Sequence, residues 1–273
     1  MKKYLYLILV AAVGCTANEE PEVMPKPVVE AWIDNGRHPQ VLFTSTVTPD
    51  TDGGELADAL LRWGKVTISD GENDYVMTGM RDNDYFPPYR YTTTELVGVP
   101  GTTYRITASY KQLRAEAVCT MHEPTRIDSI TFSDCGVDTL RAAMLHFTAP
   151  DDVPAYYYLT ISDRAGSPVS LPCLLGWKEC TVPNVAVAVA IMNSKQTVIG
   201  ERFHPQLRLN GSYVVSLHRV EKPVYDFWRA YDDALLFGSN MLLGSVASLP
   251  SNINGGFGVF GARGTDTKAF IVK

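Results

Sequence analysis

The stretch Tyr104-Arg105-Ile106-Thr107-Ala108-Ser109-Tyr110-Lys111 decides the fold class, because apolar and polar side chains alternate along its whole length. Successive side chains of a strand point to opposite faces, so this period of two predicts a strand with one dry and one wet face. The alternation continues after Gln112 at Ala115, Ala117 and Cys119. We therefore predict two neighbouring strands at the centre of an all-β fold.

Further strand patterns lie on the N-terminal side of this pair. They are the short apolar and β-branched runs Val28–Ile33, Val41–Val47, Lys65–Ser69 and Tyr75–Met77. Asp70-Gly71 has the composition of a hairpin turn between the last two runs. Short strands separated by turns predict a β-sandwich over residues 28–122, similar to immunoglobulin or transthyretin modules. Within it, Leu56–Trp63 is expected to form the one helical turn.

A second β unit is predicted over residues 126–273, after the seam His122-Glu123-Pro124. Its first strand patterns are Ile127–Phe132, Leu140–Phe147, Tyr156–Ile161 and Val185–Met192. The last pattern mixes Val and Ile with Ala, which is typical of a strand buried on both faces. Asn210-Gly211 predicts a hairpin turn. We expect a larger β-sandwich, or a partly closed barrel, that carries one short helix.

The helix is predicted to start near Pro223, because proline suits the first helical position. An apolar stripe with helical spacing follows at Val224, Phe227, Trp228, Tyr231 and Leu235. Such a stripe most simply packs the helix over the sheet. The alternative is that Tyr225 and Trp228 line a ligand site.

The first residues of the chain resemble a bacterial lipoprotein signal. Lys2 and Lys3 precede the apolar run Tyr4–Val13, and the small residue Gly14 stands before Cys15. The apolar run is about ten residues long, whereas a membrane-spanning helix needs about 20. A plain cleaved signal is the other alternative. We predict that residues 1–14 are removed and that Cys15 carries the lipid.

Residues 15–27 are rich in Pro and Glu, which predicts a flexible tether that lifts the folded part off the bilayer. The pair Glu19-Glu20 resembles the surface-export signal of lipoproteins from the Bacteroidota. No Asp follows Cys15 as a signal for retention at the inner membrane. We therefore expect an outer-membrane protein that is held by its acyl anchor and faces outward.

The net charge and the number of cysteines limit which partners and which disulfide bonds are expected. The net charge is −6 and no basic run occurs, so nucleic acid is not an expected partner. Four cysteines besides Cys15 would permit two disulfides in an exported protein. Cys173 and Cys180 bracket a short loop and form the favoured pair, with Cys119 and Cys135 as the second. A four-thiolate metal site is the alternative, but no C-x-x-C spacing supports it.

The clearest candidate for a contact surface is the loop Asp82–Tyr91. It combines two prolines with four aromatic side chains, which are Tyr85, Phe86, Tyr89 and Tyr91. Rigid amphipathic rings suit the recognition of sugar, peptide or protein. The alternative is that this loop joins the two β units to each other. Trp228 is the second candidate for a ligand or partner contact.

No catalytic, metal or cofactor site is predicted. Asp50, Asp52 and Glu55 provide too few ligands for a calcium loop. The Gly-rich segment Gly255–Gly258 holds no Lys and precedes no helix pattern, so it fits a closely packed strand better than a phosphate cradle. The five histidines are scattered, and neither G-x-S-x-G nor H-E-x-x-H occurs.

Several segments of the chain resemble one family. They are Pro27–Ile33, Asp84–Tyr89, the helix Val224–Tyr231 and the closing run Asn252–Ala262. In their order and combination they are similar to the domain-of-unknown-function family numbered forty-two forty-nine, which comprises lipoproteins of the Bacteroidota. Genes of that family often lie beside a TonB-dependent receptor.

The resemblance implies a non-enzymatic outer-membrane accessory that docks on such a receptor during nutrient capture or uptake. An adhesive or structural surface module is the main alternative. A surface hydrolase assembled from distant loops is the other, since absent motifs do not exclude it.

Overall fold

The structure is a computed structural model that describes residues 24–47, 59–83, 88–163, 176–191, 206–237 and 249–273. Within these ranges it is an all-β, sandwich-like fold with one helix. An eight-stranded sheet has the order β12 (Trp177–Cys180), β11 (Ala155–Asp163), β15 (Ser212–Val220), β16 (Phe257–Ile271), β1 (Pro27–Asp34), β2 (Gln40–Ser45), β6 (Arg90–Thr92) and β5 (Thr78–Met80). Two four-stranded sheets pack against its two ends.

The predicted central strand pair is confirmed as a hairpin of β7 (Thr103–Tyr110) and β8 (Leu113–Thr120). In its register, Tyr104 lies opposite Cys119, and Ile106 lies opposite Ala117. All four side chains are buried, while Arg105 on the other face is exposed. The alternation seen in the sequence therefore corresponds to one buried and one solvated face of the sheet.

The first unit is a sandwich built on this hairpin. Its four-stranded sheet has the order β4 (Asp74–Val76), β3 (Lys65–Ser69), β7 and β8, and it packs against the half of the long sheet that contains β1 and β2. The shared core includes Ala31, Phe43, Ile68, Tyr91, Ile106 and Phe260. The predicted turn at Asp70 is confirmed, since its carboxylate accepts the backbone N–H groups of Glu72 and Asn73 at 3.0 and 2.8 Å.

The second unit is also layered. A small sheet contains β10 (Leu140–Thr148), with β9 (Ile127–Asp134) on one side and β13 (Ala186–Ile191) and β14 (Leu207–Arg208) on the other. It packs against β12, β11, β15 and β16 of the long sheet. The core between the two layers includes Leu145, Phe147, Tyr157, Leu159, Val189 and Leu217.

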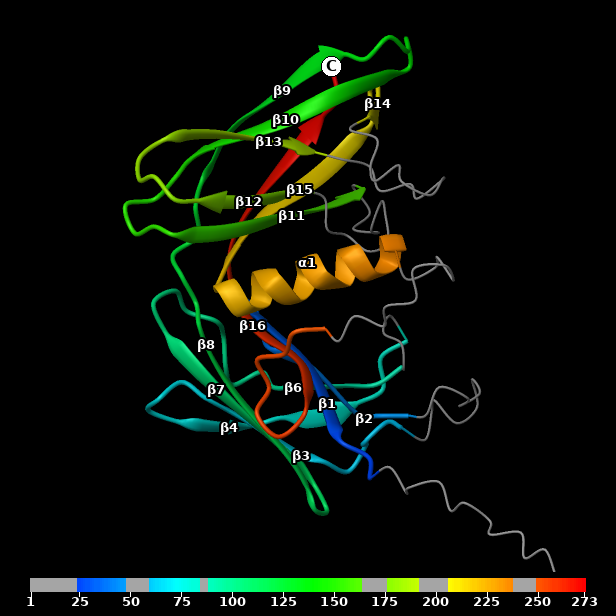
Figure 1. The fold of residues 1–273 in the computed structure, drawn as a ribbon, viewed down its shortest axis with the longest axis vertical. Coiled ribbons are helices and arrows are strands. Elements are labelled where there is room, and N and C mark those ends of the chain that lie inside the picture. Colours follow the sequence, from blue (N-terminus) through cyan, green and yellow to red (C-terminus); the bar gives the residue numbers. More distant parts are fainter. Residues whose placement is uncertain (1–23, 48–58, 84–87, 164–175, 192–205, 238–248) are drawn as a thin grey trace, which may run out of the picture.

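The strand β16 belongs to both units (Figure 1). Its first half, Phe257–Arg263, pairs in parallel with β1, and its second half, Gly264–Ile271, pairs antiparallel with β15. The predicted division into 28–122 and 126–273 therefore assigns too much to the second unit. A strand from the C-terminal end of the chain completes the first sandwich.

The predicted helix is confirmed as α1 (Lys222–Phe237), with Pro223 in its first turn. Figure 1 shows α1 lying across the waist of the molecule, beneath β11 and β15. Its inward side chains Val224, Tyr225 and Phe227 join the core of the first unit. The helix thus covers the face of the long sheet that the small sheet of the second unit leaves open.

Three local predictions are wrong. Of the predicted helical turn Leu56–Trp63, residues 56–58 lie outside the described ranges, and residues 59–61 run beside β2, where Leu61 N–H donates to the Phe43 carbonyl at 3.0 Å, instead of forming a helical turn. The turn at Asn210-Gly211 is present, but it joins β14 and β15, which lie in different sheets. β13 is buried on one face only, because its alanines 186 and 188 point to solvent. In each case tertiary pairing overrides the local pattern.

Candidate functional site

The structure separates the four aromatic residues predicted for the contact loop. Tyr91 is 2 % exposed, and its hydroxyl donates to the Leu61 carbonyl inside the first core. Its prediction as a contact residue is therefore wrong, because β6 turns this ring inward. Tyr89 is half-buried and its hydroxyl donates to the Arg62 carbonyl at 2.9 Å. Tyr85 and Phe86 lie outside the described residues.

The base of this loop is fixed on both sides. The Arg90 guanidinium pairs with the Asp82 carboxylate at 2.5 Å, and Asp82 N–H donates to the Pro88 carbonyl at 3.3 Å. Both side chains of the pair are about one-fifth exposed. The ion pair and the backbone hydrogen bond therefore hold the residues on either side of the segment with Tyr85 and Phe86 close together, at the edge of the long sheet.

An aromatic residue that the sequence analysis overlooked lies beside this loop. Trp63 is 88 % exposed, the largest exposed fraction among the described large hydrophobic residues. The hydrogen bond from the Tyr89 hydroxyl to the Arg62 carbonyl brings the loop and Trp63 together. The one signal in the sequence is that Trp63 stands directly before Gly64, whereas the pattern around it predicts a helical turn.

The backbone holds Trp63 outward. On one side, Leu61 N–H donates to the Phe43 carbonyl at 3.0 Å. On the other, Gly64 N–H donates to the Tyr91 hydroxyl at 2.9 Å. We call Trp63 and Tyr89 the aromatic edge. Leu61, two residues before Trp63, and Gly64, directly after it, are thus hydrogen-bonded to core residues, and the indole projects from a fixed point.

Trp228, the second predicted contact residue, packs the helix. Its ring stacks on that of Trp32 with the ring centroids 5.3 Å apart and the planes 23° from parallel. Phe227 and Tyr231 meet it edge-on. The interpretation of the apolar stripe as helix packing accounts for these contacts. The indole N–H groups of Trp228 and Trp177 are buried and have no hydrogen-bond partner among the residues that the structure describes.

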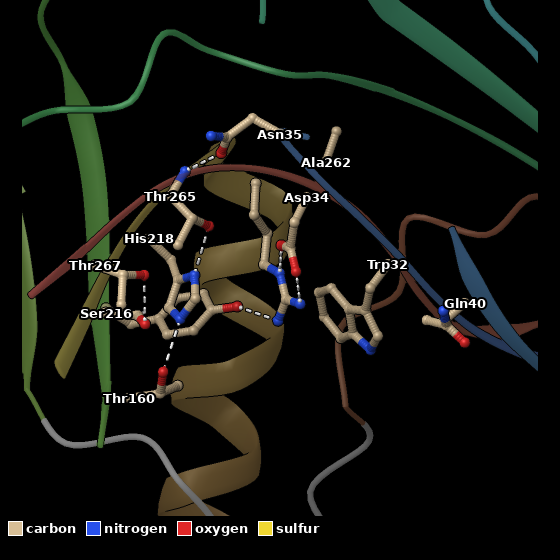
Figure 2. A network of polar contacts seen from close by, with 12 residues as sticks. Trp32, Asp34, Asn35, Gln40, Thr160, Ser216, His218, Ala262, Thr265 and Thr267 are labelled. Atoms are coloured by element: carbon tan, nitrogen blue, oxygen red, sulfur yellow. Dashed lines mark hydrogen bonds and ion pairs between the residues drawn. The ribbon is translucent and has the colours of Figure 1, made fainter. Parts of the chain in front are cut away.

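A network of polar side chains extends from this stack (Figure 2). The Arg263 guanidinium lies over the Trp32 ring, 4.9 Å from its centroid. Its Nε and Nη2 donate to the two Asp34 carboxylate oxygens, the second at 2.7 Å, in a bidentate pair. Nη1 donates to the Tyr158 hydroxyl at 3.3 Å. Arg263 is the residue of β16 at which its pairing with β1 ends.

His218 closes the network on the β15 side. Its Nε2 lies 2.8 Å from the Thr160 hydroxyl and its Nδ1 lies 2.9 Å from the Thr265 hydroxyl. Burial and the positive charge of Arg263 lower the pKa of His218 to about 3. Burial acts to raise the pKa of Asp34, but the charge and hydrogen bonds of Arg263 hold it below its usual value. The network therefore contains a neutral imidazole and one satisfied ion pair.

This arrangement is suited to joining elements. Each oxygen of Asp34 and each nitrogen of His218 has a partner, so neither group is left free to accept or deliver a proton at a substrate. The side chains come from β1, β11, β15 and β16, the strands that meet at the centre of the long sheet. We interpret the network as the junction between the two units.

The cysteines do not form the second predicted disulfide. Cys119, Cys135 and Cys180 are free thiols. Cys119 lies in the first core, where its sulfur accepts the Ala262 N–H at 3.2 Å and burial raises its pKa. Cys135 directly follows β9, whose eight residues extend about 25 Å away from the seam at residues 122–124 that lies close to Cys119 in the chain. Bonded cysteines need Cα atoms within about 7 Å of each other. The pairing of Cys119 with Cys135 is therefore wrong.

Two other predictions concern residues without a described structure. Cys15 and Cys173 both lie outside the described ranges. Cys180, the predicted partner of Cys173, is a buried thiol whose pKa is raised by burial. Within the described ranges, no three His, Cys, Asp or Glu side chains gather as metal ligands would. The same part of the chain has no helix long and apolar enough to cross a membrane.

The fold and these contacts define a class of protein, a two-unit all-β chain whose units share one strand and enclose a structural ion pair. The chain belongs to the family described as Domain of unknown function (DUF4249), whose model matches residues 16–269. No curated protein matches the chain.

Proposed function

We propose that the protein is a lipoprotein, anchored through Cys15 to the outer membrane and facing outward. In this proposal it docks on a TonB-dependent receptor and assists the capture or uptake of a nutrient without catalysing a reaction. The observation that carries the docking proposal is Trp63, which is 88 % exposed on a backbone fixed to the core.

An exposed tryptophan of this kind is best explained by a partner. Trp is among the residues most enriched at the energetic centres of protein interfaces, because one rigid ring buries a large area at little entropic cost. Tyr89 stands beside it, and the loop that carries Tyr85 and Phe86 is closed at its base by the pair of Asp82 and Arg90. These features support a preformed docking surface at this edge.

The tether supports the same proposal. A lipid at Cys15 would confine the protein to the membrane that holds the receptor. A flexible segment over residues 15–27 would then give a high effective concentration of one partner for the other. A modest contact area at the aromatic edge would suffice under these conditions.

The test is an affinity capture of the tagged full chain from mildly solubilised outer membranes, read by mass spectrometry. We expect a TonB-dependent receptor in near-equal amount. Trp63→Ser, and separately Tyr85→Ala with Phe86→Ala, should reduce the captured receptor several-fold. Val182→Ser is the matched control, because Val182 is a 58 % exposed apolar residue of the second unit.

The outcomes separate the alternatives. Equal capture by the Trp63→Ser and Val182→Ser variants would remove the aromatic edge from the proposal. Absence of any receptor from the capture would favour the adhesive or hydrolytic alternatives. A Cys15→Ala variant that remains bound to the membrane would contradict the lipid anchor.

A further inference from the structure

The outward face of the four-stranded sheet of the first unit carries a regular array of hydroxyl and basic groups. The pairing of β3 with β7 sets Thr67 opposite Thr107 and Ser69 opposite Arg105. Lys65 lies opposite Ser109 in the same register. We call these six residues the hydroxyl face. They alternate with core residues along both strands, so all six point away from the sandwich.

This face is hollowed. One depression of about 460 Å³ and another of about 430 Å³ lie on it. Both are lined by Ser69 and Arg105, so Arg105 stands where they meet. The second depression extends along the sheet to Lys65 and Arg114 and is also lined by Asp74, while Asp70 lines the first.

The cations at the two ends of this surface are unpaired in the part of the chain that the structure describes. Arg90, Arg219 and Arg263 each hold a carboxylate there. Arg105 and Lys65 have no ion pair, and the hydroxyls of Thr67 and Thr107 make no hydrogen bond within the same ranges. Arg114 is the exception on this face, since its Nε donates to Glu116 at 2.7 Å. These unpaired positive charges contrast with the negative net charge of the whole chain, which is −6.

The chemistry of these groups selects a class of ligand. Hydroxyl side chains donate and accept hydrogen bonds, as sugar hydroxyls do, and a guanidinium binds a carboxylate through two parallel hydrogen bonds. Among the described residues, no aromatic ring lines either depression, so stacking against a neutral sugar is not the recognition mode. An extended peptide is disfavoured, because β3 and β7 are paired on both sides and offer no free edge.

We propose that the hydroxyl face binds an acidic oligosaccharide that carries uronate groups. Arg105 holds one carboxylate at the meeting point of the two depressions. Thr67 and Thr107 bond the hydroxyls of the sugar beside it, and Lys65 faces a carboxylate further along the chain of sugars. This binding requires none of the receptor contacts proposed for the aromatic edge. It therefore goes beyond the docking function and can be tested independently of it.

The test is a calorimetric titration of the detergent-solubilised full chain with tetragalacturonate. We expect saturable binding that weakens as salt is added, because the contact is charged. Arg105→Gln should weaken binding about ten-fold or more, the factor that corresponds to about 1.4 kcal/mol and thus to the loss of one charge-assisted contact. Arg208→Gln is the matched control, since Arg208 is an exposed arginine of the second unit.

Three results would overturn the proposal. They are no saturable binding by the unmodified protein, equal weakening by Arg105→Gln and Arg208→Gln, and equal affinity for the neutral maltotetraose. Circular dichroism of both variants establishes that the fold is intact. Capture of the receptor by the Arg105→Gln variant should remain at the level of the unmodified protein, which separates a failure of this site from a failure of docking.

Discussion

At the scale of single residues, the pair of Asp34 and Arg263 joins β1 to β16 at the junction between the two units. The carboxylate and the guanidinium are each about one-fifth exposed, so neither is well hydrated once its partner is removed. The pair also positions the Arg263 guanidinium against Trp32 and the Tyr158 hydroxyl. Removal of one member therefore affects three strands at once, which are β1, β11 and β16.

We predict that Arg263→Met lowers the free energy of unfolding by about 2–4 kcal/mol, because it leaves the Asp34 carboxylate without its counter-charge. The double variant Asp34→Asn with Arg263→Met should recover part of this loss. Urea unfolding followed by tryptophan fluorescence measures both variants. A double variant no more stable than Arg263→Met would show that the ion pair is not the cause.

His218 predicts a dependence of stability on pH. Its pKa is about 3 in the folded chain, whereas the ordinary value is 6.5, so the unfolded chain binds more protons between these values. Its contribution is fully present above pH 6.5 and is lost as the pH falls toward 3. From pH 7.5 to pH 5 the loss should be about 2 kcal/mol.

The variant His218→Gln isolates this effect. It keeps polar atoms near the hydroxyls of Thr160 and Thr265 and does not titrate. Urea unfolding at pH 7.5 and pH 5 should show a smaller drop for His218→Gln than for the unmodified protein. Equal drops in the two proteins would mean that another group controls the acid sensitivity.

At the scale of elements, the parallel pairing of β1 with β16 depends on Gly258. This residue has φ +108, and a Cβ atom there would overlap the Val29 carbonyl of β1. The interpretation of Gly255–Gly258 as a closely packed strand entry fits this geometry. A side chain here would both strain the backbone and separate the two strands.

We predict that Gly258→Ala costs about 2–4 kcal/mol of unfolding free energy. Gly36→Ala is the matched control, because Gly36 has φ +71 but open space around its Cα. It should cost about 1 kcal/mol, from the backbone conformation alone. Thermal unfolding of both variants by circular dichroism tests the difference, and equal costs would remove the role of strand contact.

The elements that the sequence predicted well are those with a strong local pattern. The hairpin of β7 and β8 follows from the strict alternation at Tyr104–Lys111, and α1 follows from Pro223 and the stripe that begins at Val224. The exchange of β14 and β15 between sheets could not be predicted, because an Asn-Gly turn fixes a reversal of the chain but not the partners of its strands.

The candidate site was predictable only in part. The loop rich in aromatic residues could be recognised in the sequence, but the sequence did not show that Tyr91 points inward. The exposure of Trp63 depends on hydrogen bonds that Leu61 N–H and Gly64 N–H donate to the Phe43 carbonyl and the Tyr91 hydroxyl, and both acceptors are distant in sequence. From the sequence, only the solvent-facing residues of one strand of the hydroxyl face could be predicted. Their alignment with the residues of β3 depends on the register of the sheet.

At the scale of the whole molecule, β16 makes the two units dependent on each other. Val259, Phe260 and Ala262 of this strand are fully buried in the first core, although they lie near the C-terminal end of the chain. A fragment of residues 24–125 lacks them and leaves one edge of β1 unpaired. The first unit should therefore not fold by itself.

We predict that fragment 24–125 is unfolded by circular dichroism, and that the same fragment joined to residues 250–263 by a flexible linker recovers β structure. The full chain should unfold in one cooperative transition. Cooperative folding of fragment 24–125 alone would contradict the shared-strand account.

The central functional claim is that Trp63 marks the surface on which a receptor docks. The most direct measurement places a photo-crosslinking amino acid at position 63 of the full chain in living cells, with position 182 as the matched control. We expect one dominant product at position 63, with a TonB-dependent receptor, and none at position 182. No product at position 63, or the same products at both positions, would contradict it.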